Sequence, residues 1–277
     1  MKSHKKTLLV RKIFLYAIMV AITLVTVGPF LMTIFMSLKS ASEGIYDSVL
    51  PMAPTFQNFI DAFAKANFGS YFMNTVIVTA LAVPLNLLFC SLAAYPLARM
   101  DFRGRGAVLA IIIATMMVPF QLYMAPLFQL TGELGLRNTH IGLIVLQVST
   151  AFGIFLMRQA YLRIPKELEE SAYIDGANQF QVWYKVVLPL VKPTLVTLAI
   201  FTFMGTWGDY LWPLLNSESS SMYTLSIGMA SLAQNFDGAN LKLISAASII
   251  TTIPTLLIFI GLQKFFISGA TDGAVKG

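Results

Sequence analysis

The sequence predicts an all-α polytopic membrane protein with six transmembrane helices. Hydrophobic residues make up 57% of the 277 residues and charged residues only 12%, whereas about a quarter of an average soluble domain is charged. The mean hydropathy is +0.73. A chain that spans a bilayer must satisfy its own backbone hydrogen bonds, so it forms helices or a closed barrel. The apolar runs exceed the roughly ten-residue strands of barrels, and they therefore indicate helices.

Six apolar runs are long enough to cross the hydrocarbon core, which takes about 20 helical residues. The first run follows a basic start and exceeds the roughly 7–15 apolar residues of a cleaved signal peptide, so we expect an uncleaved helix. We expect residues 1–277 to form a single transmembrane domain. The predicted spans are about 13–38, 71–98, 107–129, 141–160, 194–215 and 243–266.

Prolines interrupt two of these runs. Pro84 lies in the second run, and Pro119 and Pro126 lie in the third. A proline in a membrane helix frees a backbone carbonyl and kinks the helix, and neighbouring helices or water can satisfy the freed group. These prolines predict either ordinary bundle geometry or a discontinuity that lines a pathway.

The basic residues orient the spans. Fifteen of the 19 Lys and Arg residues fall on the side of both termini and the loop 158–192, and four fall on the other side. Because short loops rich in Lys and Arg stay in the cytoplasm, we predict that both termini and this loop are cytoplasmic. The net charge of +6 follows from this asymmetry, so we expect membrane lipid and no nucleic acid as a partner. The outer loops are then about 40–70, 130–140 and 216–242.

Several kinds of chemistry are not supported by the sequence. Cys90 is the only cysteine, and His4 and His140 lie far apart, so no spacing suggests a metal site. The chain carries no G-x-x-x-x-G-K-[ST] phosphate loop. It also shows no nucleophile–base pair. We therefore expect a non-catalytic chain without a cofactor of its own.

The cytoplasmic loop 158–192 is too long for a simple connector, because most connections are much shorter. Pro165 suits a first helical position, and three glutamates follow where the helix dipole favours carboxylates. Gly176 is a natural helix stop, and Asn178 can cap a second helix that carries aromatic residues. The pattern predicts two short helices. They could form a plain linker, an interfacial helix pair on lipid headgroups, or a docking element for a cytoplasmic protein.

The same loop carries a spaced motif. It reads Glu170-Ser171-Ala172, three residues, Gly176, nine residues and then V-V-L-P at 186–189. This resembles the EAA motif of ABC-importer permeases, E-A-A-x-x-x-G, nine residues, I-x-L-P. Ser171 and Val186 replace an alanine and the isoleucine, and both changes are small.

Two further segments are similar to carbohydrate-type permeases. Residues 207–213, W-G-D-Y-L-W-P, resemble their W-N-D/E-F-L-W-P segment, with Gly208 in place of the asparagine. The tail 269–277, G-A-T-D-G-A-V-K-G, is similar to their typical ending, S-G-L-T-A-G-A-V-K-G. Over essentially its whole length the chain resembles the maltose-permease G-subunit family.

The resemblance implies the transmembrane domain of a type I ABC importer in the inner membrane of a bacterium. It implies a second, homologous permease subunit in a heterodimer, an external solute-binding protein, and a cytoplasmic ATPase dimer that binds ATP and Mg. One short helix of the loop would dock into the ATPase, and Glu170 would make a polar contact there. The implied coupling residues are Glu169, Glu170, Ser171, Ala172, Asp175, Gly176, Leu188 and Pro189, and the tail residues Gly273, Ala274, Val275 and Lys276 would reach the ATPase pair.

The solute pathway is marked more weakly. Polar residues inside apolar runs are functional candidates in transporters, and aromatic faces with a carboxylate suit a sugar or sugar-like solute. The same residue types also join helices or gather at membrane edges. The candidates are Asn86, Gln121, Gln147, Trp207, Asp209, Tyr210 and Trp212.

Two other classes of function compete with an ATP-driven importer. A secondary carrier or channel without an ATPase predicts paired intramembrane charges or an inverted repeat, and neither is evident. A membrane scaffold or enzyme without a transport role is the other. The outer loop 216–242 could contact the solute-binding protein, or its serines could form a solvated turn.

Overall fold

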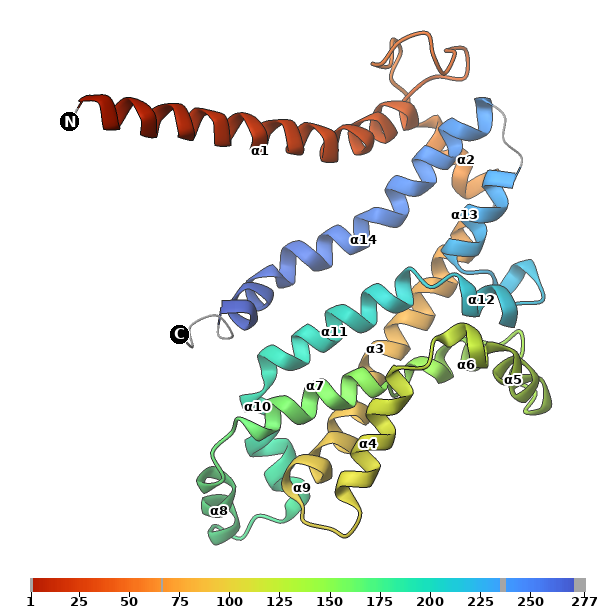
Figure 1. Ribbon diagram of the computed structural model, residues 1–277. Coiled ribbons are helices and arrows are strands. Elements are labelled where there is room, and N and C mark those ends of the chain that lie inside the picture. The colour runs from red at the N-terminus through yellow and green to blue at the C-terminus, as the bar shows by residue number, and fades with distance from the viewer. Residues whose placement is uncertain (1, 66, 235–237, 272–277) are drawn as a thin grey trace. The chain divides into compact units, whose positions relative to one another are not determined.

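The computed structural model describes the backbone of residues 2–65, 67–234 and 238–271, and this part of the chain contains helices and no strand (Figure 1). The chain divides into two compact units. The first is Met1–Phe68 with Met229–Ile253, and the second is Gly69–Gly228 with Pro254–Gly277. This division into compact units does not test the predicted single transmembrane domain over residues 1–277, which stays a prediction.

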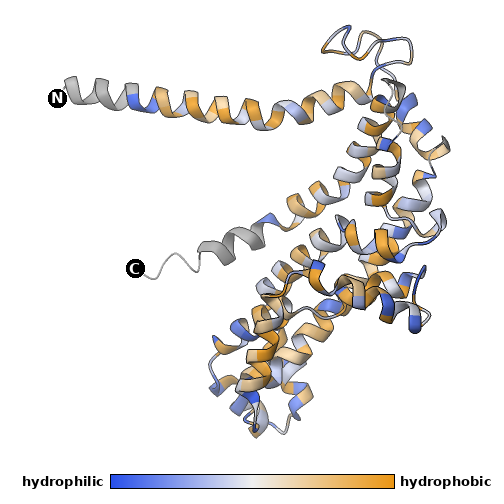
Figure 2. Ribbon diagram, turned by 45° about the vertical axis from the view of Figure 1, so that its right-hand side comes forward, coloured by the Kyte–Doolittle hydropathy of each residue, from blue (hydrophilic) through white to orange (hydrophobic). Residues whose placement is uncertain are grey.

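The first unit begins with α1, Lys2–Ser37, which contains the first predicted span. No residue of its most apolar 18-residue window is buried within the chain. Figure 2 shows hydrophobic residues along the described length of this helix. A helix that is apolar on its exposed sides needs lipid or another subunit around it.

Two buried lysines organise the loop that follows α1. Lys39 is 1% exposed and donates to the backbone carbonyls of Gly44, Ile45 and Ser48 at 2.6–3.2 Å. Lys242 is 4% exposed and donates to the carbonyl of Ser40 at 2.6 Å. Each ammonium replaces its water shell by carbonyl oxygens, which offsets the cost of burying a charge. The predicted outer loop 40–70 also contains a helix, α2, Gln57–Lys65.

The second unit is built around α3, Phe68–Arg99, which contains the second predicted span. Pro84 lies inside this helix without breaking it. A break of the kind that the prolines predict is found in the third predicted span. There α4, Arg105–Met116, and α5, Phe120–Glu133, meet at a bend of 101°, and Pro119 stands directly before α5.

The next two predicted spans are also interrupted. The fourth begins with α6, His140–Ile144, and a short 3-10 helix, η1, Val145–Gln147. It then bends by 42° into α7, Ala151–Leu162. The fifth, predicted as 194–215, is α11, Lys192–Trp207, followed after a break by α12, Leu211–Asn216. Each break leaves backbone groups that need partners, so each is a place for side-chain caps.

The last predicted span, 243–266, lies within α14, Gly238–Thr271. The predicted outer loop 216–242 contains the 3-10 helix η3, Ser220–Met222, and α13, Leu225–Gln234. Among the described residues three helices are long and apolar enough to cross a membrane, and three bent helix pairs raise that number to as many as six. In the second unit α7 packs against both α4 and α11 (Figure 1).

Candidate functional site

The loop 158–192 forms short helices, as the sequence predicts. The first is α8, Glu167–Ile174, and Lys166 rather than Pro165 stands at its N-cap. The expected position of Pro165 as the first helical residue is therefore wrong by two residues. The second region comprises α9, a π-helix η2 and α10, with bounds Gln179–Gln181, Val182–Val187 and Leu188–Leu190.

Gly176 ends the first helix in the manner expected. Its φ is +82°, a left-handed conformation that glycine adopts without steric cost. The amide of Gly176 donates to the carbonyl of Tyr173 at 3.0 Å, and the amide of Ala177 donates to the carbonyl of Ala172 at 3.0 Å. This pair of bonds is a Schellman motif, which satisfies the last carbonyls of α8. The turn at Gly176 is therefore fixed by the backbone.

Asn178 caps the second region, also as expected. Its side chain accepts from the amide of Gln181 at 2.9 Å, and the side chain of Gln181 accepts from the amide of Asn178 at 2.9 Å. This reciprocal capping box satisfies two backbone donors. Trp183 then lies buried in the core beside α3 and α7, and its burial anchors the loop.

The outer face of α8 is exposed. Glu170, Ser171 and Asp175 are exposed, and Ile174 is 86% exposed. This face of α8 therefore presents one apolar and three polar side chains outside the loop. Of the remaining predicted coupling residues, Gly176 and Pro189 are exposed, Ala172 and Leu188 are half-buried, and Glu169 is buried. The predicted tail residues Gly273, Ala274, Val275 and Lys276 lie outside the described residues.

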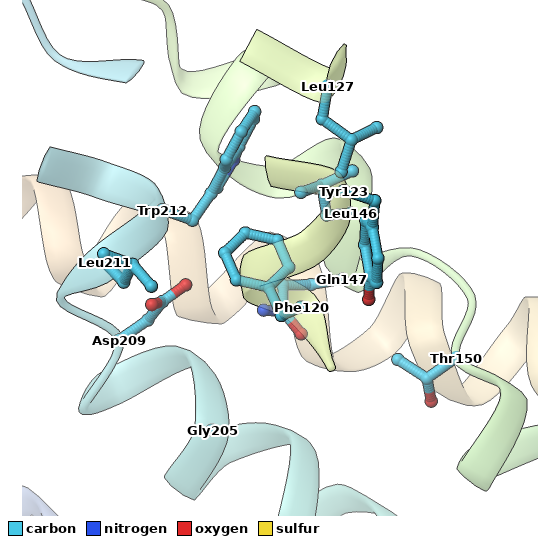
Figure 3. A pocket seen from close by; sticks show the side chains of 10 residues that line it. All are labelled: Phe120, Tyr123, Leu127, Leu146, Gln147, Thr150, Gly205, Asp209, Leu211 and Trp212. Carbon is cyan, nitrogen blue, oxygen red and sulfur yellow. The ribbon is translucent and has the colours of Figure 1, made fainter. Parts of the chain in front are cut away.

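A cavity of about 490 Å³ opens where the broken spans meet in the second unit. It collects three of the predicted pathway residues, Gln147, Asp209 and Trp212 (Figure 3). A second cavity of about 650 Å³ shares Tyr123, Leu146 and Thr150 with it. The first cavity is lined by Phe120, Tyr123, Leu127, Leu146, Gln147, Thr150, Gly205, Asp209, Leu211 and Trp212.

Hydrogen bonds at the break between α11 and α12 position the side chains of Asp209 and Trp212. The carboxylate of Asp209 accepts from the backbone amides of Leu211 and Trp212, so it caps the first turn of α12. The indole Nε1 of Trp212 donates to the carbonyl of Gly142 at 2.9 Å. Its ring meets that of Phe120 edge to face, with 6.2 Å between the centroids. The cavity therefore combines aromatic faces, an amide and a carboxylate.

The other predicted pathway residues do not line this cavity. Asn86 is fully buried between helices. Trp207 stacks on Phe203 at 5.3 Å and lines a separate apolar cavity of about 380 Å³. Gln121 and Tyr210 are exposed. Some polar residues of the apolar runs thus line the cavity, and others pack between helices.

Sequence reasoning missed seven of the ten lining residues, among them Phe120, Tyr123 and Thr150. Phe120 and Tyr123 follow Pro119, and the N-terminal end of α5 directs them to the cavity. The side chain of Thr150 accepts from the amide of Gly153 at 3.2 Å and caps α7. A proline followed by aromatic residues, and a threonine three residues before a glycine, are the signals that could have revealed both breaks.

These features define a polytopic membrane protein whose broken spans line a largely apolar cavity with a few polar groups, and whose loop 158–192 projects a short helix. The chain belongs to the family of binding-protein-dependent transport system inner membrane components, which matches residues 86–271. It is thus a permease subunit of an ABC importer.

Named relatives extend over nearly the whole chain. A permease protein of an arabinooligosaccharide transport system, AraQ from Halalkalibacterium halodurans, is 36% identical over 92% of this chain and 93% of its own length. The melibiose/raffinose/stachyose import permease MelC from Bacillus subtilis is 35% identical over 90% and 91%. The lactose transport permease LacG from Rhizobium radiobacter is 31% identical over 94% and 95%.

A solved structure confirms the fold class. A chain of a bacterial ABC transporter that imports the acidic polysaccharide alginate has a TM-score of 0.84 and 25% identity, covering 93% of this chain and 96% of that one. The predicted all-α transmembrane domain of a type I ABC importer, and the resemblance from which it was drawn, are therefore confirmed.

Proposed function

We propose that this permease subunit carries a neutral sugar or short oligosaccharide into the cytoplasm, and that the outer face of α8 docks into a separate ATPase that binds ATP and Mg. The observation that carries the docking is the exposed outer face of α8, with Glu170 at its first turn and Ile174 86% exposed at its end. Glu170 supplies a polar contact, and the fixed turn at Gly176 lets the ATPase surface approach closely.

The cavity supports the class of solute. Tyr123 and Trp212 offer ring faces, Gln147 an amide and Asp209 a carboxylate, which are the groups that bind sugar rings and hydroxyls. No lysine or arginine lines this cavity of the second unit, so an acidic saccharide would meet a carboxylate without a counter-charge. Relatives named for arabinooligosaccharide, melibiose and lactose transport agree with a neutral saccharide.

The assembly follows from the same proposal. Both termini and the loop 158–192 face the cytoplasm, on the side that holds fifteen of the 19 basic residues. A second, homologous permease subunit completes the pathway, and an external binding protein delivers the solute. The tail residues 273–276 reach into the ATPase pair.

Reconstitution tests the docking. The transporter is assembled with its ATPase, partner permease and binding protein, and Glu170→Trp and Gly176→Trp are introduced together. We expect solute-stimulated ATP hydrolysis to fall to the unstimulated rate while membrane insertion is retained. Glu133→Trp is the matched control, since Glu133 is an exposed glutamate on α5, at the other end of the spans. Normal stimulation in the double variant would refute the docking.

Uptake assays test the solute and the energy source. Proteoliposomes are offered labelled neutral oligosaccharides and, separately, an oligouronate, after a thermal-shift panel has identified what the binding protein holds. We expect ATP-dependent uptake of a neutral saccharide that Tyr123→Ala weakens. Uptake that persists without the ATPase and follows an ion gradient would favour a secondary carrier. Unchanged uptake without this chain would favour a scaffold.

A further inference from the structure

The inner face of α8 is attached to the end of α3 by a buried ion pair. Arg99 Nε lies 2.6 Å from Glu169 Oε1, and the two side chains are 5% and 8% exposed. The hydroxyl of Tyr95 donates to the other oxygen of Glu169 at 3.1 Å, and Tyr95 also hydrogen-bonds Tyr173, one turn further along α8. Removing one partner of a buried ion pair leaves an uncompensated charge, so the pair resists separation.

The chain on either side of α8 is attached to α3 as well. Arg99 Nη2 donates to the carbonyl of Ile164, just before α8, at 2.6 Å. After α8, the indole of Trp183 donates to the hydroxyl of Tyr161 at 3.2 Å, and that hydroxyl donates to the carbonyl of Ser91 at 3.3 Å. Ser91 and Arg99 stand eight residues apart on one face of α3, about 12 Å along its axis. The loop therefore holds α3 over two turns.

The same helix reaches the cavity wall. The amide of Asn86 on α3 donates to the carbonyl of Gln147 at 2.7 Å, and the amide of Thr150 donates to Cys90 Sγ on α3 at 3.4 Å. Gln147 and Thr150 both line the cavity. α3 is one continuous helix from Phe68 to Arg99, with Pro84 and Pro96 inside it, whereas the spans beside it are broken. It is thus a continuous connection between α8 and the cavity wall.

We propose that α3 carries the movement of α8 to the cavity wall, with Glu169 and Arg99 as positioning residues that make α8 and α3 move as one body. The inference rests on the proposed docking of α8 to the ATPase. Apolar contacts alone let two helices slide, but a buried ion pair with fixed hydrogen bonds holds one register. The two adjacent glutamates thus have different roles: Glu170 faces the ATPase, and Glu169 faces α3.

The experiment measures the distance between α8 and α3 in the assembled transporter. Spin labels are placed at Ser171→Cys on the outer face of α8 and at Met100→Cys beside the end of α3. Both positions are exposed, and Cys90 is fully buried, so labelling is selective. We expect one narrow distance distribution that is unchanged when ATP is added. In the presence of Glu169→Gln we expect the distribution to broaden and the solute imported per ATP to fall about fivefold or more.

Two further variants separate a positioning role from general stability. Glu169→Asp keeps the charge, so we expect it to restore part of the import per ATP that Glu169→Gln loses. Asp101→Asn is the matched control, because Asp101 pairs with Arg105 at 3.0 Å on the exposed surface beside α3. We expect it to leave both the distance and the import per ATP unchanged, since exposed pairs contribute little.

The outcomes distinguish this inference from the docking itself. A cross-link between Ser171→Cys and the ATPase is measured in the otherwise unchanged chain. Its absence would overturn the docking. A present cross-link together with an ATP-dependent distance between α8 and α3 would overturn only the attachment of the two helices. Normal import per ATP in Glu169→Gln would also overturn the attachment of α8 to α3. The distance in the chain with native Glu169 tests the attachment even if Glu169→Gln fails to fold.

Discussion

The hydroxyl of Thr202 donates to the side-chain oxygen of Asn86 at 3.0 Å, although the two residues stand 116 positions apart. Asn86 gives its amide to the carbonyl of Gln147 at 2.7 Å. One fully buried side chain thus joins α3, α11 and the break before α7. The polar side chain of Asn86 hydrogen-bonds groups on the elements that meet around it. Because Asn86 does not line the cavity, we infer that its role is helix packing.

Replacing Asn86 with leucine is therefore expected to lower stability rather than to change solute preference. The variant leaves the Gln147 carbonyl and the Thr202 hydroxyl without partners. Hydrogen bonds between membrane helices are worth about 0.6–1.7 kcal/mol each, so we expect a loss of about 1–3 kcal/mol, read as a lower midpoint of thermal unfolding in detergent. Thr23→Val is the control, because the hydroxyl of Thr23 donates to the carbonyl of Met19 within the same helix, α1. An unchanged midpoint in Asn86→Leu would contradict the packing role.

How much of this site the sequence predicts depends on the range of the interactions. Composition and charge predict the helices, and local caps predict the stop at Gly176 and the start at Asn178. The adjacent glutamates Glu169 and Glu170 show the limit. Both are good first-turn residues, and Arg99 and Tyr95, 70 and 74 positions earlier, determine that Glu169 faces inward.

The breaks in the spans are a second example. Residues 208–210 lie inside an apolar run and look continuous in the sequence. The break is stabilised by groups that come from elsewhere, such as the Gly142 carbonyl that accepts from Trp212. Periodicity within one segment carries no information about such partners, so it does not reveal the lining residues Phe120 and Tyr123. The proline at 119 marks its break because proline disrupts a helix locally.

Two substitutions of Asp209 separate capping from solute binding. Asn can accept the same backbone hydrogen bonds, so we expect Asp209→Asn to keep the stability of the wild type. We expect its uptake of a neutral saccharide to fall about tenfold, the value of one hydrogen bond to a charged group at about 1.5 kcal/mol. Asp209→Ala should also lower stability by about 0.5–2 kcal/mol through the lost cap. The measurements are uptake kinetics and thermal unfolding. Full uptake with Asp209→Asn would limit Asp209 to capping.

A test of the turn at Gly176 uses the left-handed backbone. Gly176→Ala places a side chain at φ +82°, which costs about 1–2 kcal/mol. Because open space surrounds the position, the cost comes from the backbone alone. We expect a lower unfolding midpoint and a weaker cross-link from Ser171→Cys to the ATPase. Gly106→Ala, also in open space but inside α4, should be neutral or stabilising by up to about 1 kcal/mol. Equal effects of the two variants would contradict the role of the turn.

Glu43 gives the loop after α1 a defined dependence on pH. The amides of Met52 and Ala53 donate to its carboxylate, each at 2.9 Å. These two bonds lower the pKa of Glu43 from 4.5 to about 2. Because the pKa is lowered in the folded loop, the stabilisation is complete above the ordinary value and is lost as pH falls through about 2. The loop should therefore keep its structure throughout the neutral range.

Hydrogen exchange of the Met52 and Ala53 amides, corrected for intrinsic rates, measures this dependence. We expect constant protection from pH 8 to about 5 and a progressive loss between about 4.5 and 2, where the carboxylate takes up a proton. Glu43→Gln removes the charge at every pH, so the two amides should be less protected even at pH 7 and should show no such transition. Ser42→Ala beside it controls for a change in the loop. A loss of protection that begins near pH 6 would identify a different titrating group.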